Sequence, residues 1–169
     1  MNESSVLVVI RGNSGSGKST TAMAVQQRFG RAECLVVQQD TVRRLMLREG
    51  DVSGGVNVEL IEHIARFGLE RGLVVIVEGI LDAGRYGGML ERLGGVAGCA
   101  LHYCFDLSFE ETVVRHATRP QAQMFSVGQM AEWYRGWQPL PFVEEVRLDV
   151  GWELGAIVER IEGDVRGWR

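Results

Sequence analysis

Short apolar runs alternate with amphipathic stretches along almost the whole chain of 169 residues. The runs at residues 6–11 and 73–78 consist almost entirely of valine, leucine and isoleucine. Uninterrupted apolar runs of this length are typical of strands that are buried on both faces of a parallel sheet. The pattern predicts strands at residues 6–11, 34–38, 73–78, 99–105 and 143–148.

The stretches between these runs carry apolar residues at helical spacing. Ser108 with Glu111 and Ser126 with Gln129 have the spacing of a helix capping box. Helices are predicted at residues 19–29, 41–48, 58–71, 86–93, 109–117, 127–134 and 154–161. Strand and helix in alternation predict an α/β fold, a three-layer sandwich with a five-stranded parallel sheet. Such sheets bind ligands at the carboxyl ends of their strands.

The organisation of the chain indicates one domain. Its length suits a single hydrophobic core, and no repeat, low-complexity run or proline-rich linker divides residues 1–169. Residues 1–5 carry no basic side chain, and the apolar run that follows is too short for a signal peptide or a membrane span. Three cysteines, Cys34, Cys99 and Cys104, form no C-x-x-C pair. We therefore expect a cytoplasmic protein with free thiols.

The charge of the chain narrows the range of partners. A net charge of −4 and an isoelectric point near 5.4 argue against a wide nucleic-acid or membrane-binding surface, because both usually require excess positive charge. Lys18 is the only lysine among the 18 basic residues. Arginine replaces lysine easily on a solvated surface, but not where a compact ammonium group must fit between phosphate oxygens.

Lys18 lies in a glycine-rich motif. Residues 12–19 read G-N-S-G-S-G-K-S and fit the pattern G-x-x-x-x-G-K-[ST] directly after a predicted strand. The glycines allow main-chain amides to surround a phosphate, and the following helix directs its positive end at the same anion. We expect Lys18 to bind the β- and γ-phosphates and Ser19 to hold Mg²⁺. The alternative is a chance glycine-rich turn. The predicted nucleotide-binding residues are Gly12, Asn13, Ser14, Gly15, Ser16, Gly17, Lys18, Ser19 and Thr20.

Two further strands end in acidic residues. Asp40 follows the second predicted strand and could accept the proton of an acceptor hydroxyl, with Arg43 one turn later. Alternatively, Asp40 caps the helix from residue 41 and Arg43 belongs to a solvated face. Glu78 ends the third strand, where a carboxylate could hold a magnesium-bound water or orient the acceptor, or could be an ordinary surface group.

A third group of candidates lies between residues 115 and 137. Arg115 and Arg119 are four residues apart and hence on one helical face, which suits a lid that neutralises charge on transferred phosphate. They could equally be surface arginines. The aromatic cluster of Trp133, Tyr134 and Trp137 either packs in the core or stacks on a planar acceptor or on adenine. Residues 50–57, with two adjacent glycines, form either a mobile loop beside the acceptor or a plain linker.

The order of these motifs resembles that of the P-loop kinases that act on small molecules and polynucleotides. This group includes the kinase half of phage polynucleotide kinase, the zeta-toxin kinases, chloramphenicol phosphotransferase and the tunicamycin-resistance proteins. The resemblance spans about residues 6–150, and only its P-loop is a specific motif. It implies that Asp40 is the general base and that Arg43 contacts the acceptor. Most members place aspartate where this chain has Glu78.

Taken together, motifs and resemblance imply an ATP- and Mg²⁺-dependent kinase that phosphorylates a hydroxyl group of a small, nucleoside-like or antibiotic-like molecule. Lys18, Asp40, Arg115 and Arg119 would be catalytic, and Arg43 and Glu78 would bind the substrate. Two alternatives stay open. A polynucleotide 5′-hydroxyl kinase would need a basic channel, which the overall acidity disfavours. A nucleotide-dependent switch would keep the P-loop but would not need Asp40 with Arg43. The oligomeric state is not predicted.

Overall fold

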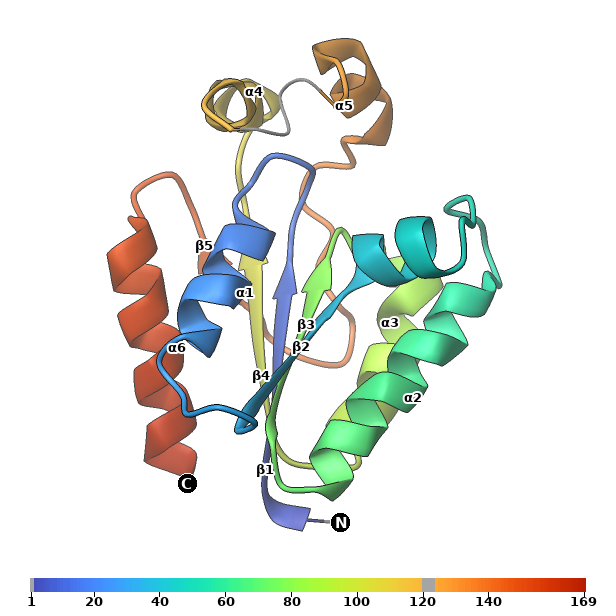
Figure 1. Cartoon of the computed structure of the whole chain (residues 1–169). Helices are drawn as coiled ribbons and strands as arrows, with labels where there is room; N and C mark the ends of the chain where they lie inside the picture. Colours follow the sequence, from blue (N-terminus) through green and yellow to red (C-terminus); the bar gives the residue numbers. More distant parts are fainter. Residues whose placement is uncertain (1, 120–123) are drawn as a thin grey trace.

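The computed structural model of the protein describes residues 2–119 and 124–169. Within this part of the chain, five strands form one sheet in the order β2-β3-β1-β4-β5, and every neighbouring pair is parallel. The predicted α/β fold is confirmed (Figure 1). The strands are β1 (Asn2–Arg11), β2 (Cys34–Gln38), β3 (Val74–Gly79), β4 (Ala97–Phe105) and β5 (Val146–Leu148).

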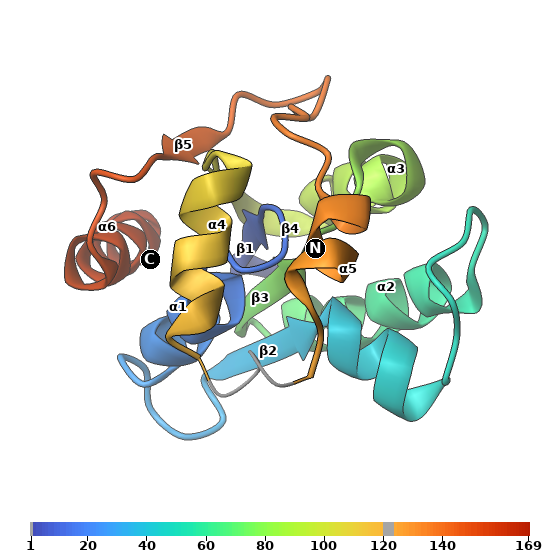
Figure 2. The ribbon, with the colours of Figure 1, turned by 90° about the horizontal axis from the view of Figure 1, so that it is seen from above.

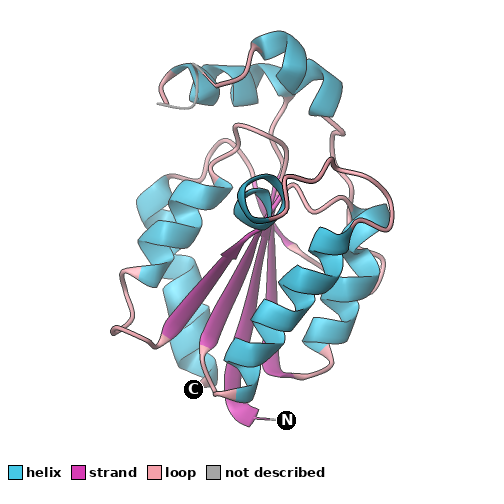
Figure 3. Cartoon of the chain, turned by 45° about the vertical axis from the view of Figure 1, so that its right-hand side comes forward, coloured by secondary structure: helices cyan, strands magenta, loops and turns pink. Residues whose placement is uncertain are grey.

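Helices cover both faces of the sheet, so the protein has three layers (Figure 3). Helices α1 and α6 pack on one face, where side chains such as Val25 and Ile161 are fully buried against the strands. Helices α2 and α3 cover the other face through Ile61 and Leu90. The helices are α1 (Lys18–Gln26), α2 (Val56–Glu70), α3 (Ala83–Gly94), α4 (Phe109–Ala117), α5 (Val127–Trp133) and α6 (Leu154–Trp168), with a π-helix, η1 (Thr41–Met46), after β2.

The boundaries of several elements differ from those predicted. Helix α6 continues to Trp168, seven residues past the predicted end, because Val165 extends its buried face beyond Gly163 and Asp164. Strand β5 is shorter than predicted, because its pairing with β4 is limited to Tyr103–Phe105. Residues 41–46 wind as a π-helix rather than the predicted α-helix, with the amide of Leu47 bonded to the carbonyl of Val42.

Sheet order determines where the site forms. Strand β1 lies between β3 and β4, and all residues from Val6 to Arg11 are buried, as are those of β3. The carboxyl ends of these strands meet at one edge, and helices α4 and α5 lie above that edge (Figures 1 and 2). The loops after β1, β2 and β3 therefore converge beneath the α4–α5 segment.

The cysteines of this fold carry free thiols, as expected. Cys34, Cys99 and Cys104 are all free, with Cys34 and Cys104 buried and Cys99 half-buried. Among the described residues, no helix combines the length and the apolar character needed to cross a membrane.

Candidate active site

The loop after β1 has the shape of a phosphate cradle. Gly12, Gly15 and Gly17 have φ angles of 152°, 79° and 112°, a region that side chains disfavour. A Cβ atom at Gly12 would lie 2.8 Å from the Cβ of Phe105, and one at Gly15 would lie 2.8 Å from the carbonyl oxygen of Thr112. Conformation and space thus both require glycine here. The loop leads directly into the N-terminus of α1 at Lys18.

Lys18 is buried in this loop. Its Nζ donates a hydrogen bond of 2.8 Å to the carbonyl oxygen of Asn13 and lies 3.5 Å from the Oγ of Ser16. Burial lowers the pKa of the ammonium group, an effect that the nearby carboxylates of Glu78 and Asp40 partly oppose. A buried ammonium group whose hydrogen-bond partners are neutral oxygens stabilises an anion that binds beside it.

The two arginines of the α4 region reach the same loop. Nη1 of Arg115 donates to the carbonyl oxygen of Ser16 at 2.8 Å. A Cβ atom built on Gly17 would lie 3.3 Å from Nη2 of Arg119 and 3.7 Å from Nη1 of Arg115. Burial and the neighbouring Arg115 lower the pKa of Arg119. Two arginines about a hundred positions further along the chain thus bring positive charge to the P-loop.

Asp40 lies on the opposite side of the site and does not cap η1. It stands at the N-cap position without a side-chain capping bond, and its carboxylate is exposed. Its Oδ1 instead accepts from Nη2 of Arg43 at 3.3 Å and lies 3.5 Å from Nε of Arg44. Arg43 also donates to the carbonyl oxygen of Glu49, and Arg44, rather than Arg43, lines the cavity described below.

Glu78 lies between the two sides. Its Oε1 accepts a hydrogen bond of 2.8 Å from the hydroxyl of Ser19, and the side chain is buried. Burial raises the pKa of Glu78, although Lys18 and the bond from Ser19 act in the other direction. A hydroxyl and a carboxylate are the oxygen ligands that Mg²⁺ prefers, so these two residues fit the predicted metal. Elsewhere in residues 2–119 and 124–169, no cluster of three acidic, histidine or cysteine side chains could hold a metal ion.

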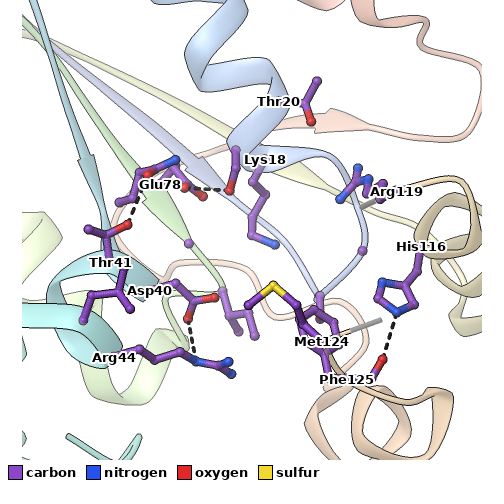
Figure 4. Close-up of a pocket in the computed structure, with 17 residues that line it drawn as sticks. Lys18, Thr20, Asp40, Thr41, Arg44, Glu78, His116, Arg119, Met124 and Phe125 are labelled. Carbon is purple, nitrogen blue, oxygen red and sulfur yellow. Dashed lines mark hydrogen bonds and ion pairs between the residues drawn. The ribbon is translucent and has the colours of Figure 1, made fainter. Parts of the chain in front are cut away.

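Groups from both sides line one cavity of about 390 Å³. Lys18 and Arg119 point in from one side, and Asp40 and Arg44 lie across from them (Figure 4). Met124 and Phe125 from the segment before α5 cover the cavity, and Leu45 and Ile80 add an apolar wall. The predicted residues that line this cavity are Ser14, Gly15, Lys18, Ser19, Thr20, Asp40, Glu78 and Arg119. The predicted residues that do not line it are Gly12, Asn13, Ser16, Gly17, Arg43 and Arg115.

An aromatic chain connects this cover to the acceptor side. Nε2 of His116 lies 3.1 Å from the carbonyl oxygen of Phe125, and the two rings stack at 4.8 Å. Phe125 meets Trp133 edge to face at 5.3 Å, and the guanidinium of Arg44 lies 5.3 Å from the ring of Trp133. Trp133 therefore contacts two residues that line the cavity but does not line it itself.

A second cavity, of about 470 Å³, lies on the other side of the P-loop. It is lined by Thr20, Phe105 and Arg115 and by residues that precede and begin α6, including Trp152 and Leu154. Gly17, Thr20 and Arg119 line this space, and Thr20 and Arg119 also line the first cavity. Sequence patterns did not indicate this cavity, because its walls come from segments that are distant in the chain and carry no motif.

Asn13 has a different contact from the one its place in the motif predicts. Its side-chain amide accepts a hydrogen bond from the amide of Arg135 at 2.8 Å and donates one to the carbonyl oxygen of Gly136 at 3.0 Å. The neighbouring Arg11 pairs with buried Glu145 at 2.7 Å. The P-loop is thereby attached to the segment that returns from α5 to the sheet.

Comparison with known proteins supports the resemblance noted in the sequence. Residues 1–84 match the Zeta toxin family. Among solved structures, the APS kinase of Mycobacterium tuberculosis in complex with AMPPNP and APS is 19% identical, with a TM-score of 0.71 over 96% of this chain and 98% of that one. The tunicamycin resistance protein of Deinococcus radiodurans is 19% identical, with a TM-score of 0.63 over 95% of each chain.

A gluconokinase from Sinorhizobium meliloti 1021 is 18% identical, with a TM-score of 0.62 over 95% of this chain and 91% of that one. The comparison with curated proteins gives no sequence match. At identities of this size, the structural likeness establishes the fold alone. The chain is therefore a protein of the P-loop kinase fold whose N-terminal residues 1–84 match the Zeta toxin family.

Proposed function

We propose that this protein is a phosphotransferase that moves the γ-phosphoryl group of ATP to a hydroxyl group of a small molecule. One observation carries the proposal: Lys18 and Arg119 face Asp40 across a single cavity that Glu78 also lines. Transfer between two substrates requires this division, with cations on one side for the phosphates and a base on the other for the hydroxyl.

The phosphate side would bind and stabilise the transferred group. Lys18 would exchange its bond to the carbonyl of Asn13 for phosphate oxygens, and the main-chain amides of the P-loop would bind the same anion. Arg119 would stabilise charge that develops as the phosphoryl group leaves the nucleotide. Arg115 is already bonded to the carbonyl of Ser16 and would hold the loop in shape.

The second cavity supports the use of a nucleotide. It begins at Gly17 and Thr20, directly beside the P-loop, and half-buried Trp152 lies among the residues around it. A nucleotide whose phosphates lie at Lys18 would place its base and sugar in this space. Ring stacking on Trp152 or Phe105 would suit a planar base.

Ser19 and Glu78 would hold Mg²⁺, in agreement with the predicted role of Ser19. When bound there, Mg²⁺ would supply positive charge that neutralises the nucleotide phosphates. Because two side chains cannot complete the coordination of Mg²⁺, nucleotide phosphates and water would supply its other ligands. This assignment places Glu78 with the metal rather than with the acceptor.

Asp40 would take the proton from the acceptor hydroxyl. Its carboxylate is exposed to the cavity, and Arg43 and Arg44 fix it by ion pairs. The apolar side chains of Leu45, Ile80 and Phe125 favour an acceptor with an apolar part, and a covered cavity of this size suits a small molecule better than a polynucleotide.

Transfer of labelled phosphate from ATP tests the proposal. Wild-type protein with Mg²⁺ is screened against nucleosides, aminoglycosides and oligonucleotides with a free 5′-hydroxyl. With the acceptor found, Asp40→Asn should keep the thermal shift that ATP and Mg²⁺ produce but lower kcat by roughly 10²-fold or more. Asp82→Asn is the matched control, since Asp82 caps α3 by accepting from Gly84 and Arg85 and asparagine caps equally well.

Each outcome has a distinct meaning. A wild-type rate in Asp40→Asn would remove Asp40 from the mechanism. Transfer to oligonucleotides alone would replace the small acceptor by a polynucleotide. Nucleotide binding without transfer to any hydroxyl in the library would replace the kinase by a nucleotide-dependent switch.

A further inference from the structure

Asp40 belongs to a closed ring of hydrogen bonds that none of the sequence motifs includes. Next to it in the chain, Gln39 donates from Nε2 to the hydroxyl of Tyr86 at 2.8 Å. The Tyr86 hydroxyl lies 2.9 Å from Oδ1 of Asn57, and Nδ2 of Asn57 donates to the carboxylate of Glu49 at 2.8 Å.

The main-chain carbonyl of Glu49 connects the ring back to Asp40 through Arg43. Its carbonyl oxygen accepts from Nη1 of Arg43 at 3.0 Å, and Nη2 of the same guanidinium donates to the carboxylate of Asp40 at 3.3 Å. Gln39, Asn57 and Arg43 each donate along the ring, and the single proton of the Tyr86 hydroxyl is shared between Oδ1 of Asn57 and Oδ1 of Asp51. The peptide bond between Gln39 and Asp40 closes the circle. The ring thus joins the two residues between β2 and η1, η1 itself, the loop before α2, α2 and α3.

Three of the six residues in the ring are buried, which makes the hydrogen bonds between them costly to break, whereas Arg43 and Glu49 are half-buried and Asp40 is exposed. Gln39, Asn57 and Tyr86 are at most 2% exposed. Burial and the nearby Asp51 raise the pKa of Tyr86 to about 12, so its hydroxyl keeps the proton that it donates. A buried donor or acceptor that loses its partner destabilises the structure more than a surface group would. The part of the ring from Gln39 through Tyr86 to Asn57 is therefore a rigid support, and the bond from Arg43 to Asp40 extends it to the surface.

Residues in and next to the ring also hold the loop of residues 50–57 in place. The carboxylate of Glu49 accepts from the amides of Val56 and Asn57, at 2.6 and 2.9 Å, and so caps the start of α2 from seven residues away. Asp51 lies 3.0 Å from the Tyr86 hydroxyl and pairs with Arg85 at 3.1 Å. The loop is thereby fastened at both ends to groups that also hold Asp40.

From this arrangement we infer that Tyr86, Asn57 and Glu49 are positioning residues that hold the Asp40 carboxylate in the cavity through Gln39 and Arg43. This inference rests on the proposed function for its effect on transfer, but the ring itself can be tested without an acceptor. If it holds, Arg43 acts through Asp40 and does not bind the acceptor, which departs from the role that the resemblance implied.

The variant Tyr86→Phe removes the hydroxyl and keeps the ring that packs in the core. Tyr103→Phe is the matched control, because Tyr103 is also 1% exposed and donates to a carboxylate, that of Asp164, remote from the site. Gln39→Leu breaks the neighbouring link and provides a second variant if Tyr86→Phe does not fold. Two quantities are measured for each: hydrogen exchange of residues 39–57 without nucleotide, and kcat and KM for the acceptor found in the screen.

We expect both ring variants to raise amide exchange in residues 39–57 by about 10-fold, and Tyr103→Phe to leave it unchanged. We expect kcat to fall about 10-fold, with no change in the KM for ATP, because a displaced base affects the reaction rather than nucleotide binding. Unchanged exchange in both ring variants would overturn the inference, whether or not an acceptor is known. Faster exchange with wild-type kcat would show that the ring is structural and does not position Asp40. If the wild-type protein transfers phosphate to nothing, the proposed function fails, and the exchange data still decide whether the ring holds the segment.

Discussion

The hydroxyl of Ser19 donates a hydrogen bond of 2.8 Å to the carboxylate of Glu78, although the two residues are 59 positions apart in the chain. Ser19 belongs to the P-loop motif, and Glu78 ends the strand paired with β1, in register with Ile10. The pairing of β1 with β3 therefore brings the acidic strand end beside the residue of the motif that we propose to bind Mg²⁺. This contact supports the assignment of Glu78 to the metal.

The first prediction concerns this contact. Glu78→Gln keeps the size of the side chain and removes its charge, so the Mg²⁺ concentration for half-maximal activity should rise about 10-fold. Magnesium titrations of the transfer reaction measure it. An unchanged Mg²⁺ requirement would show that Glu78 does not contribute to metal binding.

The same variant should change the pH dependence of stability. The pKa of Glu78 is higher in the folded than in the unfolded protein, so ionised Glu78 reduces stability once the pH rises through these values. Glu78→Gln should therefore have a higher Tm than wild type at about pH 8, with a smaller difference at about pH 4. Thermal melts without nucleotide or Mg²⁺ make the comparison. An equal difference at both pH values would contradict the prediction.

Lys18→Ala should abolish transfer by several orders of magnitude and remove the thermal shift caused by ATP and Mg²⁺. Without nucleotide, its Tm should not fall, because burial lowers the pKa of Lys18 and the charged group adds no stability of its own. Lys18→Arg should be almost as inactive, since a planar guanidinium does not replace a compact ammonium group. Near-normal transfer in either variant would contradict the nucleotide assignment.

Arg119 and Arg115 should differ in effect. Arg119→Ala should lower kcat by about 10²-fold with a smaller change in the KM for ATP, because its contribution is greatest as phosphate charge develops. Arg115→Ala should mainly raise the KM for ATP, because Arg115 holds the carbonyl of Ser16. Steady-state kinetics with exposed Arg31→Ala as the control distinguish the two. A larger loss of kcat in Arg115→Ala would reverse the roles.

The ion pair of Arg11 with Glu145 should be the most sensitive of the charged pairs in the described residues. Both side chains are at most 3% exposed, and Glu145 also accepts from the amide of Leu140. Glu145→Ala leaves a buried guanidinium unpaired and should cost about 3–5 kcal/mol of unfolding free energy. Glu162→Ala, which removes the partner of the exposed side chains of Arg166 and Arg28, should cost less than about 1 kcal/mol. Urea denaturation compares them, and equal losses would contradict the argument.

The sequence alone determined how strands and helices alternate along the chain and the nature of the phosphate site. Apolar runs as continuous as those of β1 and β3 are compatible with burial on both faces of the sheet. The three glycines between residues 12 and 17, followed by Lys18, are typical of a phosphate-binding loop. These features are local, so periodicity and spacing reveal them. The same local patterns also placed Asp40 and Glu78 at strand ends.

Only the tertiary structure decided which of these groups meet. Sheet order brings Glu78 to Ser19, whereas the turn of η1 directs Arg44 into the cavity and Arg43 towards Glu49. The hydroxyl of Tyr86 reaches Asn57 and Gln39 from a different helix, and no spacing in the chain records that contact. Contacts between distant segments depend on how helices pack on the sheet, and packing is set by side-chain volume and shape throughout the core rather than by any one motif.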